Sequence, residues 1–85
     1  MYQVLLTSKA RKQLRNFDRP LRKRMDIVLL ALSQNPRPNG VKKLTDVKPD
    51  TFRVRIGDYR IIYHILDDKL IVEVIEIGGR KDIYR

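Results

Sequence analysis

The chain has 85 residues, of which 42% are hydrophobic and 34% are charged, a balance typical of one small folded domain and not of a disordered segment. Its 19 lysines and arginines against 10 aspartates and glutamates give a net charge of +9. That charge favours a phosphate-rich partner, with nucleic acid ahead of an anionic membrane surface, and an acidic protein as a further option.

Several classes of site and location are excluded by the residues that the chain lacks. Without cysteine it can form neither a disulfide framework nor a thiolate metal site, and the single His64 excludes a multi-histidine metal site. No apolar run approaches the roughly 20 residues of a membrane span, and the N-terminus lacks the plan of a signal peptide. We therefore expect a cytoplasmic protein of one domain, residues 1–85, with no metal, no cofactor and no membrane partner.

The first part of the chain predicts one strand and two helices. Residues 2–6 are apolar and read as a strand, after which Thr7 or Ser8 can cap a helix over residues 9–17. Asp18 and Pro20 then begin a second helix, which ends near Gln34 because Asn35-Pro36 disfavours further helix. Its apolar residues recur at helical spacing: Leu21, Met25, Val28, Leu29 and Leu32.

Cationic residues occupy the remaining faces of the first helix and part of the connection that follows the second. On the helix they are Lys9, Arg11, Lys12 and Arg15, and we interpret them as a solvated face, with RNA backbone contact as the alternative. Residues 36–51 form a long connection, a kind of segment that is often functional. Within it, Lys42 and Lys43 are either candidate phosphate contacts or simply solvated lysines.

Residues 52–63 carry the strongest pattern in the chain. Two runs of alternating residues flank Gly57-Asp58, and a glycine-first loop of two residues predicts a β-hairpin with a type II′ or I′ turn. This loop sets Ile56 opposite Tyr59, Arg55 opposite Arg60, and Arg53 opposite Ile62. Because strand side chains alternate, the apolar residues share one face, and Arg53, Arg55 and Arg60 share the other.

Two opposed arginines are unfavourable for folding alone. Guanidinium groups about 5 Å apart, at an effective dielectric constant of about 20, repel by roughly 3 kcal/mol. The arrangement is either the solvated basic face of an edge hairpin or a preformed site for a polyanion.

A turn at Asp67-Asp68 leads to a third strand over residues 70–77, ended by Gly78-Gly79 and followed by a short tail or helical turn. With that turn, Tyr63 pairs with Val72, Ile61 with Val74, and Arg60 with Ile75. The core face then gains Leu70, Val72 and Val74, and the arginine face gains Ile71, Glu73, Ile75 and Ile77. A slip of one residue would reverse these third-strand faces.

The predicted order is therefore β-α-α-β-β-β: an α+β fold in which a small antiparallel sheet carries a two-helix hairpin on one face. The other face stays open and displays the three arginines.

No glycine-rich phosphate loop, nucleophilic cysteine or acidic cluster for magnesium is visible. A nuclease that uses the RNA 2′-hydroxyl without a metal remains possible, and it needs a base, an acid and cations for the phosphate. Arginine cannot be the base, because it stays protonated, but it binds phosphate well. The candidate bases are Tyr84, Glu73 and His64. We expect Glu73 to pair with Arg53 or Arg55, and His64 to be structural or solvated.

The element order, the hairpin Phe-Arg-Val-Arg-Ile-Gly-Asp-Tyr-Arg-Ile-Ile-Tyr and the ending Ile-Gly-Gly-Arg-Lys-Asp-Ile-Tyr-Arg together resemble the RelE/ParE superfamily of type II toxin–antitoxin toxins. The likeness covers essentially the whole chain and is closer to RelE, whose members cut messenger RNA in the ribosomal A site without a metal. It implies an endoribonuclease that forms a cyclic phosphate, with the ribosome, mRNA and a cognate antitoxin as partners.

The resemblance also implies roles for individual residues. Arg53 and Arg55 match the two basic residues of the first hairpin strand and would bind phosphate, and Arg60 would position it. Arg80 would stabilise transition-state charge, and Tyr84 would stack on the substrate base or transfer a proton. Many relatives carry a histidine where this chain has Gly79, so the general base stays open. The alternatives are a ParE-like inhibitor of DNA gyrase and a non-catalytic RNA-binding module.

Overall fold

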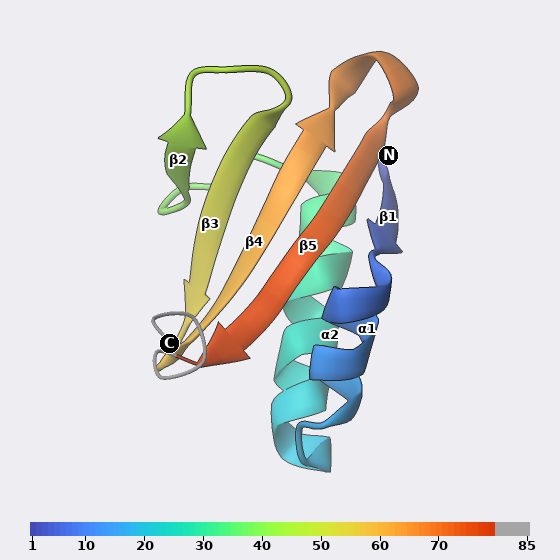
Figure 1. Ribbon diagram of the computed structural model, residues 1–85, viewed down its shortest axis with the longest axis vertical. Helices are drawn as coiled ribbons and strands as arrows, with labels where there is room; N and C mark the ends of the chain where they lie inside the picture. Colours follow the sequence, from blue (N-terminus) through green and yellow to red (C-terminus); the bar gives the residue numbers. More distant parts are fainter. Residues whose placement is uncertain (80–85) are drawn as a thin grey trace.

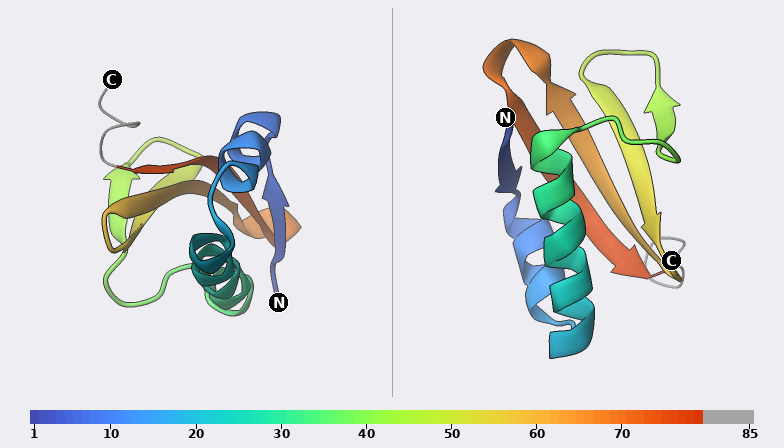
Figure 2. Two further views of the ribbon diagram at one scale, coloured as in Figure 1. Left: turned by 90° about the horizontal axis from the view of Figure 1, so that it is seen from below. Right: turned by 180° about the vertical axis from the view of Figure 1, so that it is seen from behind.

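The structure, a computed structural model, describes residues 1–79, and these form two α-helices and a five-stranded sheet. In chain order the elements are β1 (Gln3–Leu6), α1 (Ser8–Arg15), α2 (Arg19–Gln34), β2 (Lys42–Thr45), β3 (Asp50–Ile56), β4 (Tyr59–Leu66), the 3₁₀ turn η1 (Asp67–Lys69) and β5 (Ile71–Gly79). The strand order is β1-β5-β4-β3-β2, and both helices lie on one face of the sheet (Figures 1 and 2). The predicted α+β fold with a helical hairpin on one face is confirmed.

The two helices begin where their capping residues predict. The Thr7 hydroxyl accepts a hydrogen bond from the Ala10 N–H at 3.1 Å, and the Asp18 carboxylate accepts one from the Leu21 N–H at 3.1 Å. Each side chain satisfies one of the backbone donors that a helix start leaves without a partner. β1, which precedes both helices in the chain, pairs in parallel with β5. The sheet is therefore mixed and not wholly antiparallel as predicted.

The central hairpin has the predicted register. Ile56 pairs with Tyr59, Arg55 with Arg60, and Arg53 with Ile62. Gly57 has a φ of +61°, whereas Asp58 is not among the residues with positive φ. This combination is that of a type II′ turn and decides between the two predicted turn types.

The connection between α2 and β3 and the end of β5 differ from the predictions. Residues 42–45, predicted as part of a long loop, form the edge strand β2 beside β3. Gly78 and Gly79, predicted to break the third strand, continue it to residue 79. In both places the backbone pairs with a neighbouring strand, and the hydrogen bonds of this pairing outweigh the weak intrinsic preference of the residues against β-structure.

The predicted pairing of β4 with β5 is wrong by two residues. Tyr63 pairs with Val74 and not with Val72, because β4 continues to Leu66 and the turn includes Leu70, at a φ of +54°. A shift of two preserves the faces, so Val72 and Val74 are buried as predicted. Leu70 is 52% exposed in the turn and does not belong to the core.

Ile77, predicted on the arginine face, is completely buried in the core. The register changes between Ile62 and Tyr63, where a β-bulge inserts one extra residue into β5. Beyond the bulge, the odd-numbered positions of β5 face the helices.

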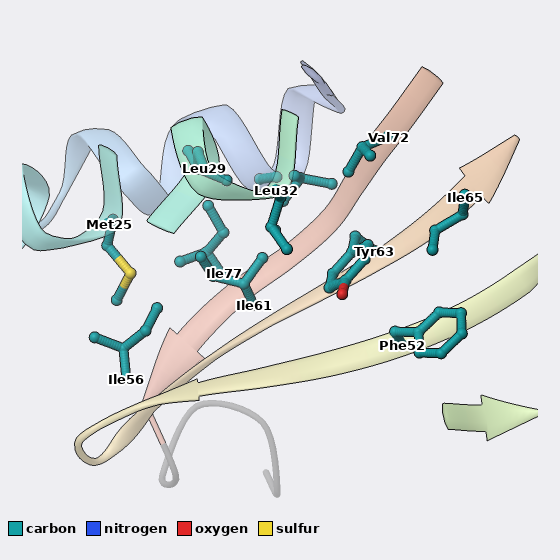
Figure 3. Close-up of a cluster of buried hydrophobic side chains, with 12 residues drawn as sticks. Met25, Leu29, Leu32, Phe52, Ile56, Ile61, Tyr63, Ile65, Val72 and Ile77 are labelled. Atoms are coloured by element: carbon teal, nitrogen blue, oxygen red, sulfur yellow. The ribbon is translucent and has the colours of Figure 1, made fainter. Parts of the chain in front are cut away.

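The core lies between α2 and the sheet. Met25 and Leu32 of α2 are completely buried, as are Ile61 and Tyr63 of β4 (Figure 3). The Tyr63 hydroxyl donates a 2.8 Å hydrogen bond to the Pro36 carbonyl, and this bond ties the chain after α2 to the middle of the sheet. Burial raises the pKa of Tyr63 to about 12, so the hydroxyl stays protonated and remains a donor. Within the described residues no helix has the length and apolar character that a membrane span requires.

Arg37 joins the loop after α2 to strand β3 and to the turn η1. Its guanidinium donates to both carboxylate oxygens of Asp67, at 3.1 and 2.8 Å, and to the Asp50 carboxylate at 3.2 Å. The Tyr2 hydroxyl donates to the same Asp67 at 2.7 Å. These hydrogen bonds, Arg37 first and Tyr2 second, lower the pKa of Asp67 to about 2.

We expect this ion-pair cluster to make the protein acid-sensitive. The folded state holds the pKa of Asp67 near 2 against an ordinary value of 3.8, so its contribution to stability is present above about pH 4 and is lost as the pH falls towards 2. Urea unfolding at several pH values from 6 to 2 measures this loss. It should be smaller in Arg37→Met, whereas Arg19→Met, which removes an exposed arginine of α2, should follow the wild type. Equal acid sensitivity of all three proteins would contradict the assignment.

Candidate functional site

Four cationic residues come together on the face of the sheet that, within residues 1–79, carries no helix. Lys42 of β2 lies directly opposite Arg53 of β3, and Arg55 of β3 lies directly opposite Arg60 of β4. Residues paired across two strands project from the same face, and Arg53 and Arg55 are two apart on one strand. The four side chains, Lys42, Arg53, Arg55 and Arg60, are called the arginine face from here on. Figure 1 shows α2 behind the sheet, so the face of the sheet opposite α2 is turned towards the viewer.

These cations differ in burial. Arg55 is exposed and Arg53 is half-buried, whereas Arg60 is only 9% exposed. The prediction that all three arginines are displayed on an open face is therefore correct for Arg55 but not for Arg60. A buried guanidinium is costly unless it is paired, so Arg60 belongs to a structured part of this surface.

The Nε atom of Arg53 is buried and, in the part of the chain that the structure describes, makes no hydrogen bond. A buried donor without an acceptor typically costs about 1–3 kcal/mol, and folded proteins rarely retain one. A phosphate oxygen would supply the acceptor, with the charge that a guanidinium binds best. Among the four cations of this face, Arg53 is thus the one with a buried donor that an anion could satisfy.

Lys42 and Lys43, both predicted as phosphate contacts, lie on opposite faces of the sheet. Lys43 pairs with Phe52, which belongs to the core face, and its ammonium lies 3.8 Å from carboxylate oxygens of both Asp46 and Asp50. Neighbouring residues of a strand point in opposite directions, so only Lys42 can join the arginine face. Of the two candidate lysines, Lys42 therefore lies on the arginine face and Lys43 lies on the core face.

His64 and Glu73 form a pair elsewhere on the same face. They lie opposite each other in β4 and β5, with His64 Nδ1 3.4 Å from Glu73 Oε1. The predicted pairing of Glu73 with Arg53 or Arg55 is wrong, because the register places a histidine beside it instead. The described residues hold no group of three or more histidines and acidic residues that could bind a metal ion.

Three arginines of the helices form a separate surface. Lys9 pairs with Glu76 of β5 at 2.7 Å, whereas Arg11, Arg15 and Arg22 line a groove of about 350 Å³ together with Leu14 and Asp26. This groove belongs to the helical hairpin and not to the arginine face (Figure 2).

Two predicted site residues, Arg80 and Tyr84, lie outside the described residues. The structure also reveals two features that the sequence did not point to, namely the unpartnered Arg53 Nε and the clamp made by Arg37. Both depend on which side chains the fold brings together, and no local motif signals them. Reading residues 42–45 as a strand would, however, have separated Lys42 from Lys43.

A family model for the ParE toxin of type II toxin–antitoxin systems (parDE) matches residues 4–84. The chain belongs to this toxin family. The toxin is 34% identical to toxin RelG of Mycobacterium tuberculosis over 85 residues, which are 99% of this chain and 97% of RelG. The predicted membership of the RelE/ParE superfamily is thereby confirmed.

Solved structures of RelE proteins share the toxin's fold. A chain of the archaeal RelE–RelB complex from Pyrococcus horikoshii superposes with a TM-score of 0.84 at 25% identity, covering 93% of the toxin and 94% of that chain. A chain of the M. tuberculosis toxin–antitoxin complex RelBE2 gives a TM-score of 0.78 at 27% identity, covering 93% and 98%. By fold and by sequence this protein is a toxin of a type II toxin–antitoxin system.

The opposite placement of Lys42 and Lys43 allows a matched test of RNA binding. The affinity for a non-cleavable 2′-O-methyl oligonucleotide should fall steeply with salt, with a slope in log K against log salt of about −0.7 for each phosphate contacted. Lys42→Ala and Arg53→Ala should each weaken binding and reduce the slope by about one contact. Lys43→Ala, which removes the same charge from the core face, should change neither. Equal effects of the two lysines would contradict the placement of the site.

Proposed function

We propose that this toxin is a ribosome-dependent endoribonuclease that cuts messenger RNA without a metal and so inhibits translation. The observation that carries the proposal is the Nε of Arg53, which is buried and has no hydrogen-bond partner among the described residues, within a cluster of four cations on the face of the sheet opposite α2. That arrangement suits a phosphate held in a fixed position. The likeness to RelG and to RelE structures supports the same class of activity.

In this reaction the RNA 2′-hydroxyl attacks the adjacent phosphorus and the bond to the 5′-oxygen of the next nucleotide breaks. The products are a 2′,3′-cyclic phosphate and a free 5′-hydroxyl. Arg53 and Arg55 would bind the phosphate, Arg60 would position it, and Arg80 would stabilise the charge that develops on its oxygens. All four are cations and none can accept the proton of the 2′-hydroxyl.

The described residues hold the other two candidate bases, His64 and Glu73, which lie opposite each other and are both poorly placed. His64 is four residues from Arg60 along β4, a separation of about 13 Å in an extended strand, and its ring nitrogen faces Glu73. With Gly79 at the position where many relatives carry a histidine, Tyr84 is the remaining proton-transfer candidate. It can also stack on the substrate base.

The toxin would be neutralised by a cognate antitoxin. RelE chains of similar fold were solved in complex with RelB. A net charge of +9 favours an acidic segment, which would order as it binds the basic surface. Cytoplasmic action on the ribosome follows from the proposed substrate.

A second candidate function is inhibition of DNA gyrase, because the matching family model is that of ParE. Such a toxin binds a protein and needs no site for RNA cleavage. A non-catalytic RNA-binding module would use the arginine face without Tyr84. The cluster around Arg53 favours RNA over gyrase as the target, and Arg80 and Tyr84 of the tail favour cleavage over binding alone.

The test is cleavage by the purified toxin on ribosomes programmed with a defined mRNA, with the 5′ ends of the fragments mapped by primer extension. Wild-type toxin should produce ends inside the A-site codon only when ribosomes are present. Arg80→Ala should slow cleavage roughly 100-fold to 1,000-fold, the usual effect of losing one donor to transition-state charge. Tyr84→Phe should also slow it, while Lys81→Ala, an adjacent charge with no assigned role, should not.

The outcomes separate the three functions. If Arg80→Ala and Tyr84→Phe both arrest growth as strongly as the wild type, the proposed nuclease site is wrong. Accumulation of gyrase–DNA cleavage complexes would favour the ParE-like activity, and RNA binding without cleavage would favour the non-catalytic module.

A further inference from the structure

The β-bulge in β5 decides which residues of this strand face the arginine cluster. Tyr63 pairs with Val74, but Ile62 pairs with Glu76, so Ile75 is the extra residue. Without the bulge, the regular pattern would place Glu76 opposite the completely buried Ile61 and Ile77 opposite Arg60. With the bulge, Ile77 is buried opposite Ile61 and Gly78 lies opposite Arg60.

Helix α1 supplies the hydrogen bonds that a neighbouring strand would otherwise make at the bulge. β1 ends at Leu6, and the last backbone bond on this side of β5 runs from the Thr7 N–H to the Val74 carbonyl at 3.0 Å. Beyond it, the Thr7 hydroxyl donates to the Ile75 carbonyl at 3.4 Å. The Gln13 side-chain oxygen accepts the Ile77 N–H at 2.7 Å.

We infer that Gln13 is a positioning residue for the proposed ribonuclease site. By accepting the Ile77 N–H it fixes the bulged register, which sets Gly78 beside Arg60. The inference rests on the proposed function, because it assigns Gln13 a role in catalysis and not only in stability. Gln13 touches none of the proposed phosphate-binding residues in the described structure and acts through the backbone of β5.

Loss of the Gln13 oxygen should displace the end of β5 without unfolding the protein. A full slip to the regular register would bury the Glu76 carboxylate in the core and break its 2.7 Å pair with Lys9, so this slip is energetically unfavourable. A partial shift of Ile77 and Gly78 does not carry this energetic cost. Displacements on that scale reduce catalysis far more than they reduce binding.

The experiment compares single-turnover cleavage on mRNA-programmed ribosomes. Gln13→Met has a similar length and no comparable acceptor, and should slow cleavage roughly 10-fold to 100-fold, with the toxin concentration for half-maximal rate changed by less than about threefold. Gln13→Glu keeps an acceptor oxygen and should stay within about threefold of the wild-type rate. Gln34→Met makes the same substitution at an exposed position of α2 and serves as the control. Gln13→Asn, whose amide is one methylene short, replaces Gln13→Met if that variant does not fold.

A spectroscopic readout separates this inference from the proposed function. In ¹⁵N-labelled toxin, the Ile77 amide should be protected from hydrogen exchange in the wild type and in Gln13→Glu. In Gln13→Met that protection should be lost, and the amides of Gly78 and Arg60 should shift. If the wild type does not cleave mRNA, the proposed function is wrong. These spectra then still show whether Gln13 maintains the bulged register.

Two results would overturn the inference. One is wild-type cleavage by Gln13→Met with an unchanged Ile77 amide. The other is a loss of cleavage in Gln13→Glu as large as in Gln13→Met, which would mean that the acceptor oxygen is not what matters.

Discussion

The packing of α2 against one face of the sheet is the interaction on which the rest of this toxin depends. Met25, Leu29 and Leu32 come from one stripe of the helix and meet Ile61, Tyr63 and Ile77 of the sheet (Figure 3). Burial of apolar area drives this contact, and it occupies only one side of a single sheet. Within residues 1–79, the opposite side carries no helix. A small chain can therefore hold a cationic surface in a fixed geometry on that side, with Arg55 exposed, Arg53 half-buried and Arg60 buried.

Strand alternation then assigns each residue to stability or to the site. Along β3, Phe52 and Ile56 are buried against the helices while Arg53 and Arg55 project the other way. The same rule separates Lys42 from Lys43 in β2, although they are neighbours in sequence. Where alternation would bury a charge, as at Glu76, the strand is interrupted by a bulge. The side chains of α1 then satisfy the backbone that the bulge exposes.

The parts of the structure governed by local chemistry could be predicted from the sequence. The capping residues Thr7 and Asp18, the end of α2 near Gln34 and the glycine-first hairpin turn are each fixed by residues close in sequence. The register of the hairpin follows from its two-residue loop, and with it the opposition of Arg55 and Arg60. Features that depend on partners distant in sequence could not be predicted. The bulge in β5, the edge strand β2, the parallel pairing of β1 and the Arg37 clamp all belong to this group.

The same distinction between local and distant determinants applies to the candidate site. Arg53, Arg55 and Arg60 were predicted on one face because alternation alone decides it, but their different burial depends on the whole fold. The Nε of Arg53, which has no hydrogen-bond partner among the described residues, opposes folding, and the apolar contacts of the other face must offset that cost. A polyanion that bound this face would remove the penalty, and anything that binds only the folded state also stabilises it. Binding energy and folding energy would therefore be coupled in this toxin through the guanidinium group of Arg53.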